Sequence, residues 1–225
     1  MAENEENKVN TQELKSEASN TVNQVRDTFK NADIKKDSIE TKGFVMDMFK
    51  NPLEKLEDVA EDTKGKYFKY AIIALIIWAG IKLISRCFAI GWHWRPYNIF
   101  DNIWSIGIAT ITPIISVLIM SLIIFIMNKK NKKTLTTVIS TVSIANIPKV
   151  IASAVSLLTI ISLKASTITT PFSSLCSVIS IVLTYFGLKN LYNEEKNTDF
   201  IKKFILIETI YYIVSVVVSF LNIYI

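Results

Sequence analysis

The chain alternates long apolar runs with short polar segments, and this alternation predicts membrane-spanning helices. Residues 103–127 contain no charged side chain, and residues 134–163 contain only one, Lys149. Between these two runs lies the segment Asn128-Lys129-Lys130-Asn131-Lys132-Lys133. Each run is longer than the stretch of about 20 residues that a helix needs to cross the hydrocarbon core of a bilayer. The pattern therefore predicts an integral membrane protein.

Five apolar stretches are predicted to be transmembrane helices, at about residues 67–90, 103–127, 135–163, 171–188 and 204–225. The third stretch has two alternative starts, because Thr134–Ser143 is rich in hydroxyl groups. This segment is either the beginning of the span or an interfacial turn in front of a span that begins near Ile144. Pro113 lies inside the second stretch and predicts a kink, because proline removes a helical hydrogen bond. The predicted fold class is an all-α membrane protein with five transmembrane helices.

The N-terminal region, residues 1–42, is polar and is predicted to be partly disordered. Between Thr11 and Ala32 the apolar residues recur every three or four positions, which is typical of a helix. Two alternatives are open for this helix. It is either solvated over its whole surface, or it docks on a partner or on the membrane surface.

Residues 43–66 are predicted to form an amphipathic juxtamembrane segment of two half-helices. Asn51 and Pro52 indicate where the second half-helix begins, since asparagine is a common N-cap and proline is tolerated in the first turn. One helical face collects the apolar residues Val45, Phe49, Leu53, Leu56 and Ala60. This segment is expected to lie along the inner leaflet, or to pack under the first span.

The distribution of lysine predicts the orientation of the chain in the membrane. Short loops that are rich in Lys and Arg stay on the cytoplasmic side. The hinge at 128–133 and a second charged hinge at 189–203 are therefore both predicted to be cytoplasmic. With five spans, this places the N-terminus inside and the C-terminus outside.

Composition and motifs argue against catalysis and nucleic-acid binding. The net charge of +5 comes largely from the hinge lysines, and no basic patch is interleaved with aromatic residues. The lone His93 excludes metal motifs that need two histidines, and no P-loop, dinucleotide fingerprint or nucleophile elbow occurs. Cys87 and Cys176 are expected to be buried thiols rather than a disulfide. We therefore predict a protein that is not an enzyme, takes no cofactor or metal, and binds no nucleic acid.

One intramembrane polar site is predicted, at Asn146, Pro148, Lys149 and Glu208. Ionisable residues inside spans are costly, so they are candidates for function. Pro148 frees the backbone carbonyl of Ile144, and freed carbonyls beside a buried cation are used in broken-helix transporters. Three alternatives are open for Lys149 and Glu208: separate contacts with the headgroups, a structural ion pair, or a transport site.

Three segments resemble the Yip family, five-span membrane proteins named in eukaryotes for interaction with Rab-type GTPases, and its bacterial branch. They are Phe44-Val45-Met46-Asp47-Met48-Phe49-Lys50-Asn51-Pro52, Ala145-Asn146-Ile147-Pro148 and Leu183-Thr184-Tyr185-Phe186-Gly187-Leu188. The resemblance covers residues 43–225. It implies a non-enzymatic scaffold or membrane-organising role in a bacterial plasma membrane, with the lipid bilayer and other membrane proteins or a second copy as partners. The alternative function is a small transporter or permease component with its site near Lys149 and Glu208.

Overall fold

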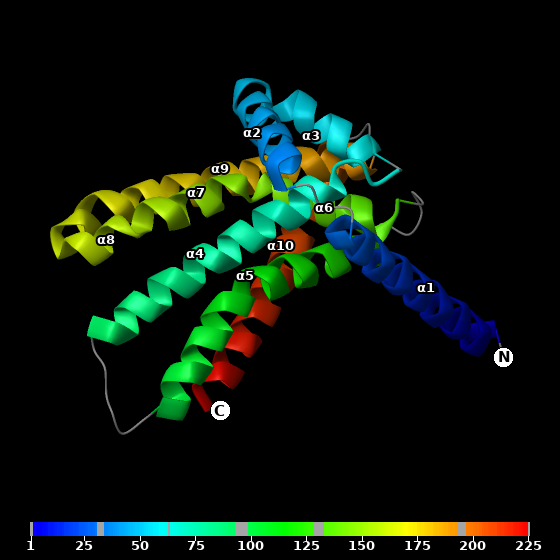
Figure 1. Cartoon of the computed structure of the whole chain (residues 1–225). Coiled ribbons are helices and arrows are strands. Elements are labelled where there is room, and N and C mark those ends of the chain that lie inside the picture. The colour runs from blue at the N-terminus through cyan, green and yellow to red at the C-terminus, as the bar shows by residue number, and fades with distance from the viewer. Residues whose placement is uncertain are drawn as a thin grey trace.

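The computed structural model of the protein describes residues 2–30, 34–62, 64–92, 99–127, 133–192 and 197–224. Within these ranges every regular element is helical (Figure 1). The elements are α1 (Ala2–Lys30), α2 (Ile34–Lys50), α3 (Pro52–Glu61), α4 (Phe68–Trp92), α5 (Ile99–Met127), α6 (Leu135–Ala145), α7 (Ile147–Ser156), α8 (Leu158–Ile161), the 3-10 turn η2 (Leu163–Ala165), α9 (Ser166–Tyr192) and α10 (Asn197–Tyr224). The expectation of an all-α protein is confirmed for the described residues.

Among the described residues three helices are long and apolar enough to cross a membrane, and a bent pair of helices counts as a fourth if the two together form one span. The three are Phe68–Ala89 in α4, Phe100–Met127 in α5 and Ser166–Tyr192 in α9. The bent pair joins α6 to α7 and α8, with an angle of 43° at the break. The fifth predicted span lies on α10, whose side chains are described only as far as Val216, and it stays a prediction.

Helix α6 is the centre of the fold. All of its residues, Leu135–Ala145, are buried. They pack against α3, α4, α5 and α9, and the start of α6 also meets α1. Residues 135–145 therefore form a helix rather than a turn, and it is the most enclosed helix among the described residues. The residue at which the third span enters the membrane stays a prediction.

The ends of two other spans differ from the predictions. Helix α9 begins at Ser166, so Pro171 lies inside it rather than at its start. The 3-10 turn η2 leads directly into α9, whose first residues, 166–170, precede the predicted start. Helix α5 runs through Pro113 as one helix and bends along its length (Figure 1), which agrees with the predicted kink. These differences lengthen two spans and leave the order of elements as predicted.

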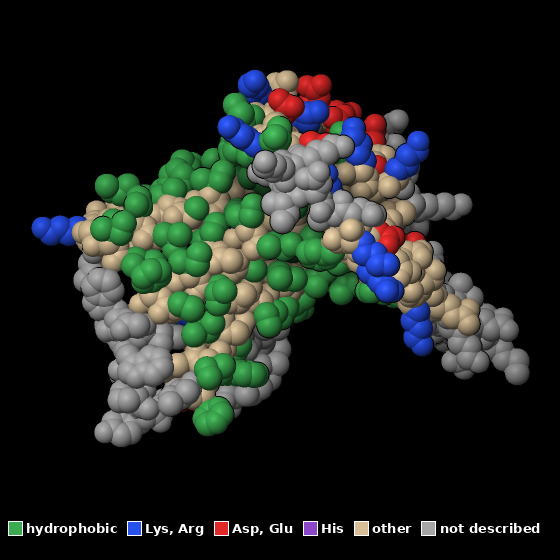
Figure 2. All heavy atoms as spheres, in the orientation of Figure 1, with side chains coloured by type: hydrophobic (Ala, Val, Ile, Leu, Met, Phe, Trp, Pro, Cys, Tyr) green, Lys and Arg blue, Asp and Glu red, His purple; other side chains and the backbone are tan. Residues whose placement is uncertain are grey.

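Helices α1, α2 and α3 form a cap across one end of the bundle. They run across the direction of the spans (Figure 1), and the Lys, Arg, Asp and Glu side chains gather over them (Figure 2). The described part of the N-terminal region forms the helix α1 from Ala2 to Lys30, and the expectation of partial disorder in residues 1–42 stays a prediction. Leu14 and Val25 of α1 pack against the main core, so this helix docks on the bundle itself.

The apolar face predicted for the juxtamembrane segment is divided in the structure. Leu56 and Ala60 are buried as expected, but Phe49 is 58% and Leu53 47% exposed. Val45 is half-buried. The helix stops at Lys50 and restarts at Pro52 as predicted, although the Asn51 side chain makes no capping bond. The division is not caused by the break alone, because the exposed Leu53 and the buried Leu56 and Ala60 lie in the same helix α3. The buried positions of α2 are Phe44 and Met48.

The two cysteines are free, as expected, but they differ in burial. Cys176 in α9 is buried, whereas Cys87 near the C-terminal end of α4 is exposed. Residues 86–89 of α4 are all exposed, so Cys87 lies where this helix extends beyond its neighbours. The expectation of two buried thiols is wrong for Cys87.

Candidate functional site: the break in the third span and its surroundings

The helical break at Asn146 has a simple local cause. Asn146 ends α6 with φ −90° and ψ 3°, and it also precedes the first residue of α7. Pro148 lies in the first turn of α7, where its missing N–H would have no helical partner in any case. The Asn146 carbonyl accepts from the backbone N–H of Lys149 at 2.9 Å and of Val150 at 3.2 Å. The break is therefore satisfied by its own backbone.

The polar side chains near the break bond mainly to the same helix. The Ser140 hydroxyl donates to the Thr136 carbonyl at 2.8 Å, and the Asn146 Nδ2 donates to the Val142 carbonyl at 2.8 Å. Such bonds to the preceding turn let serine, threonine and asparagine enter a helix interior without an external partner. This is why a segment as rich in hydroxyls as α6 can be buried completely.

Lys149 and Glu208 lie on helices that pack against different neighbours. Lys149 is in α7, which contacts α9 and α4, whereas Glu208 is in α10, which contacts α5 and, at fewer places, α9. Both side chains are half-buried. They are near enough for Coulomb attraction, but no ion pair within 4.0 Å is formed between these two described residues. Chain connectivity thus keeps Asn146, Pro148 and Lys149 together, Glu208 lies near Lys149 without forming an ion pair, and the role of these residues stays a prediction.

A buried hydrogen bond connects the first span to the helix that carries Lys149. The indole Nε1 of Trp78 in α4 donates to the Ser153 Oγ in α7 at 3.0 Å. Both residues are buried, with exposed fractions of 9% and 8%. The sequence shows each residue as one of many apolar or hydroxylated positions, so only the packing of α4 on α7 reveals the pair.

The start of α6 is held by residues from the cap, which the sequence did not indicate. The Thr134 side chain accepts from the backbone N–H of Thr137 at 3.2 Å and caps the helix. Glu17 of α1 accepts from the backbone N–H of Leu135 at 3.2 Å, and a carboxylate is favourable at a helix N-terminus. The Thr137 hydroxyl donates to the Asp62 carbonyl at 2.6 Å. The cap and the buried helix are thereby joined.

Lys69, in the first turn of α4, holds α2 against the bundle. Its Nζ contacts the Asp37 carboxylate at 2.5 Å and the Glu40 carboxylate at 2.8 Å. Beside this ion-pair group the rings of Phe44 and Tyr70 are stacked with centroids 4.7 Å apart. Lys69 therefore joins α4 to α2 through two ion pairs.

Replacing Lys69 by methionine is expected to loosen α2 without unfolding the spans. Partly exposed ion pairs contribute up to about 1 kcal/mol each, so the amides of α2 should exchange several times faster. Hydrogen–deuterium exchange of the purified protein, followed by mass spectrometry, measures this rate. The matched control is Lys55→Met, which removes a pair with Asp58 inside α3 and should leave α2 unchanged. If the α2 amides exchange at the same rate in Lys69→Met as in Lys55→Met, Lys69 does not hold α2 against the bundle.

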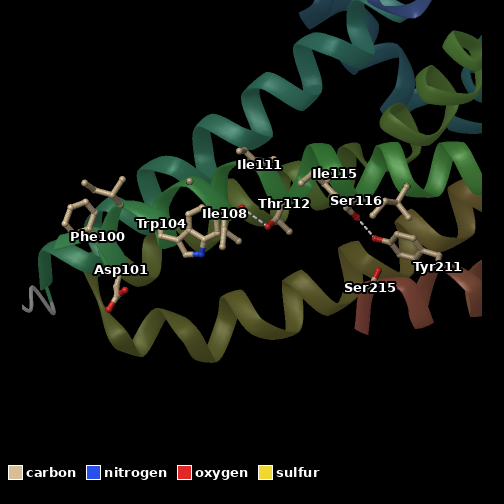
Figure 3. A pocket seen from close by; sticks show the side chains of 13 residues that line it. Phe100, Asp101, Trp104, Ile108, Ile111, Thr112, Ile115, Ser116, Tyr211 and Ser215 are labelled. Carbon is tan, nitrogen blue, oxygen red and sulfur yellow. Dashed lines mark hydrogen bonds between the residues drawn. The ribbon is translucent and has the colours of Figure 1, made fainter. Parts of the chain in front are cut away.

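The structure has a groove away from the predicted polar site. Its volume is about 930 Å³, and it lies between α5 and α10. Five of its 13 lining residues are isoleucines, with Asp101 and Trp104 at one end and Ser116 hydrogen-bonded to Tyr211 at the other (Figure 3). None of the four predicted site residues lines this groove. In the described part of the chain no three His, Cys, Asp or Glu residues are placed to hold a metal ion.

The helical architecture with several apolar helices defines a membrane-type protein, and the comparison with protein families gives the particular family. A family model described as the Yip1 domain matches residues 46–222. The match covers most of the chain, and the protein belongs to the Yip1 domain family. No curated protein and no solved structure matches the chain. The resemblance found in the sequence is confirmed at the level of the family.

Proposed function

We propose that this Yip1-domain protein is a non-enzymatic membrane scaffold or organising factor. In this proposal the chain crosses a bacterial plasma membrane five times, with its N-terminus and both lysine hinges in the cytoplasm and its C-terminus outside. Its partners are the bilayer and other membrane proteins or a second copy of the chain. The proposal rests on the packing of α6, which is buried along its whole length and is joined to the cap through Glu17 and Asp62.

This architecture favours a structural role for the packed helices over a permeation route. Helix α6 would have to line a route that passes the break in the third span, yet its Ser140 and Thr141 hydroxyls bond to its own backbone and its Thr137 hydroxyl bonds to the Asp62 carbonyl. Asn146 and Pro148 are buried at the break, and the groove lies between α5 and α10 instead. The transporter alternative therefore has no observation in its favour among the described residues.

Two measurements on the full-length protein test the proposal. Purified protein in liposomes is expected to give no ion or solute flux above that of empty vesicles. Flux that disappears in Lys149→Ala but persists in the control Lys164→Ala would establish the transporter alternative, because Lys164 is an exposed lysine outside the break. Crosslinking in native membranes is expected to trap a defined species with another membrane protein or a second copy. Exclusively monomeric protein would contradict the scaffold role.

A further inference from the structure

Helix α2 has two chemically different sides. On the outward side Ile39, Met46 and Phe49 are exposed by 74%, 52% and 58%. Lys42 and Lys50 are exposed beside them. At 100° per residue these five positions share one half of the helical circumference, and we call them the basic apolar face.

The acidic residues of α2 are turned mainly the other way. Asp37 and Glu40 are bound to Lys69 on the bundle side. Asp47 is exposed, one residue step of about 100° around the helix from Met46. Both described charges within the basic apolar face are therefore positive. Of the acidic residues of α2, Asp37 and Glu40 are bound to Lys69, and Asp47 lies at the edge of the face.

The position of α2 brings this face to the edge of the bilayer. Lys69 and the stacked Phe44 and Tyr70 rings hold α2 at the inner end of the first span. Helix α2 runs across the direction of the spans (Figure 1), as an interfacial helix does. In Figure 2, hydrophobic and basic side chains lie together on the flank of α2 that adjoins the apolar surface of the spans.

We infer that the basic apolar face of α2 binds the anionic phospholipid headgroups of the adjacent leaflet. The Lys42 and Lys50 ammonium groups contact lipid phosphates, while Ile39, Met46 and Phe49 enter the boundary between headgroups and acyl chains. Amphipathic helices with lysine and large apolar residues bind anionic membranes in this way. This inference goes beyond the scaffold role, because the contact with lipid does not depend on any protein partner.

The test places a fluorescent dye at Met46→Cys in full-length protein that also carries Cys87→Ser and Cys176→Ala. The protein is reconstituted in vesicles of phosphatidylcholine, or of phosphatidylcholine mixed with phosphatidylglycerol. We expect the dye to be protected from aqueous iodide in the mixed vesicles and much less in pure phosphatidylcholine. Each lysine near an anionic surface changes the binding constant about fivefold, so Lys42→Glu/Lys50→Glu should reduce protection by tenfold or more. High salt should weaken it in the unchanged protein.

The matched control variant, Lys15→Glu/Lys30→Glu, reverses the charge of two exposed lysines of α1. In this variant the dye should stay protected from iodide. Equal iodide access in both kinds of vesicle would overturn the inference, and so would protection that ignores both salt and the Lys42/Lys50 reversal. A photocrosslinker at Met46 that yields a protein adduct in native membranes, together with iodide access in mixed vesicles, would make the face a protein-docking surface instead. None of these outcomes depends on flux or on the scaffold's partner, so the two proposals fail separately.

Discussion

Gly187→Ala is expected to destabilise the protein by about 1–3 kcal/mol, although it adds a single methyl group. A Cβ at this position would lie 2.6 Å from the Thr141 Cγ2 and 3.7 Å from the Leu56 Cδ2. Thr141 cannot turn away freely, because it is 1% exposed and its hydroxyl donates to the Thr137 carbonyl at 2.9 Å. Helices α3, α6 and α9 approach one another closely here because residue 187 has no side chain.

The thermal unfolding midpoint of the purified protein in detergent measures this effect. Gly80→Ala in α4 is the control, since no atom lies within 4 Å of its added Cβ, and alanine should be neutral or slightly stabilising there. Thr141→Ser keeps the hydroxyl and removes the opposing methyl group, so it should restore much of the stability lost in Gly187→Ala. If Gly187→Ala is as stable as the unchanged protein, the close approach of α6 and α9 is wrong.

Trp78→Ala is expected to have the largest effect, a loss of about 3–5 kcal/mol. The indole is 9% exposed between α4 and α7, and its removal leaves a cavity and an unpaired Ser153 hydroxyl. Trp78→Phe retains most of the packing and loses only the hydrogen bond, so it should cost about 1 kcal/mol. The difference between the two variants separates packing from hydrogen bonding at the junction that positions α7.

Unfolding midpoints of the two variants, together with Ser153→Ala, test this junction. Once Trp78→Phe has removed the donor, Ser153→Ala should cost less than it does in the unchanged protein. Trp104→Ala in α5 is the control for loss of an indole, because Trp104 is 54% exposed. A larger loss for Trp104→Ala than for Trp78→Ala would contradict the assignment of Trp78 to the core.

The membrane class, the approximate positions of four apolar helices or helix pairs and the family could all be predicted from the order of residues. Charged side chains are so costly in hydrocarbon that they accumulate in hinges, which makes the uncharged runs visible in the sequence. The breaks at Pro52 and Asn146 were also predictable, since proline restricts the backbone locally. These features depend on interactions between residues that are close in the chain and on the free energy of transferring side chains between water and lipid.

The positions of side chains inside the bundle required the tertiary structure. Hydropathy does not distinguish a span that faces lipid from one that faces protein, so the central place of α6 was not visible in its Ser- and Thr-rich sequence. The same limit applies to Lys149 and Glu208, because the sequence alone does not show how near α7 brings Lys149 to Glu208 of α10. Lys69 with Asp37 and Glu40, and Trp78 with Ser153, are contacts across distant segments. The order of residues shows which segments are apolar enough for lipid and which are too polar for it. The packing of the helices establishes which side chains are in contact, because those contacts form only when remote parts of the chain share one interior.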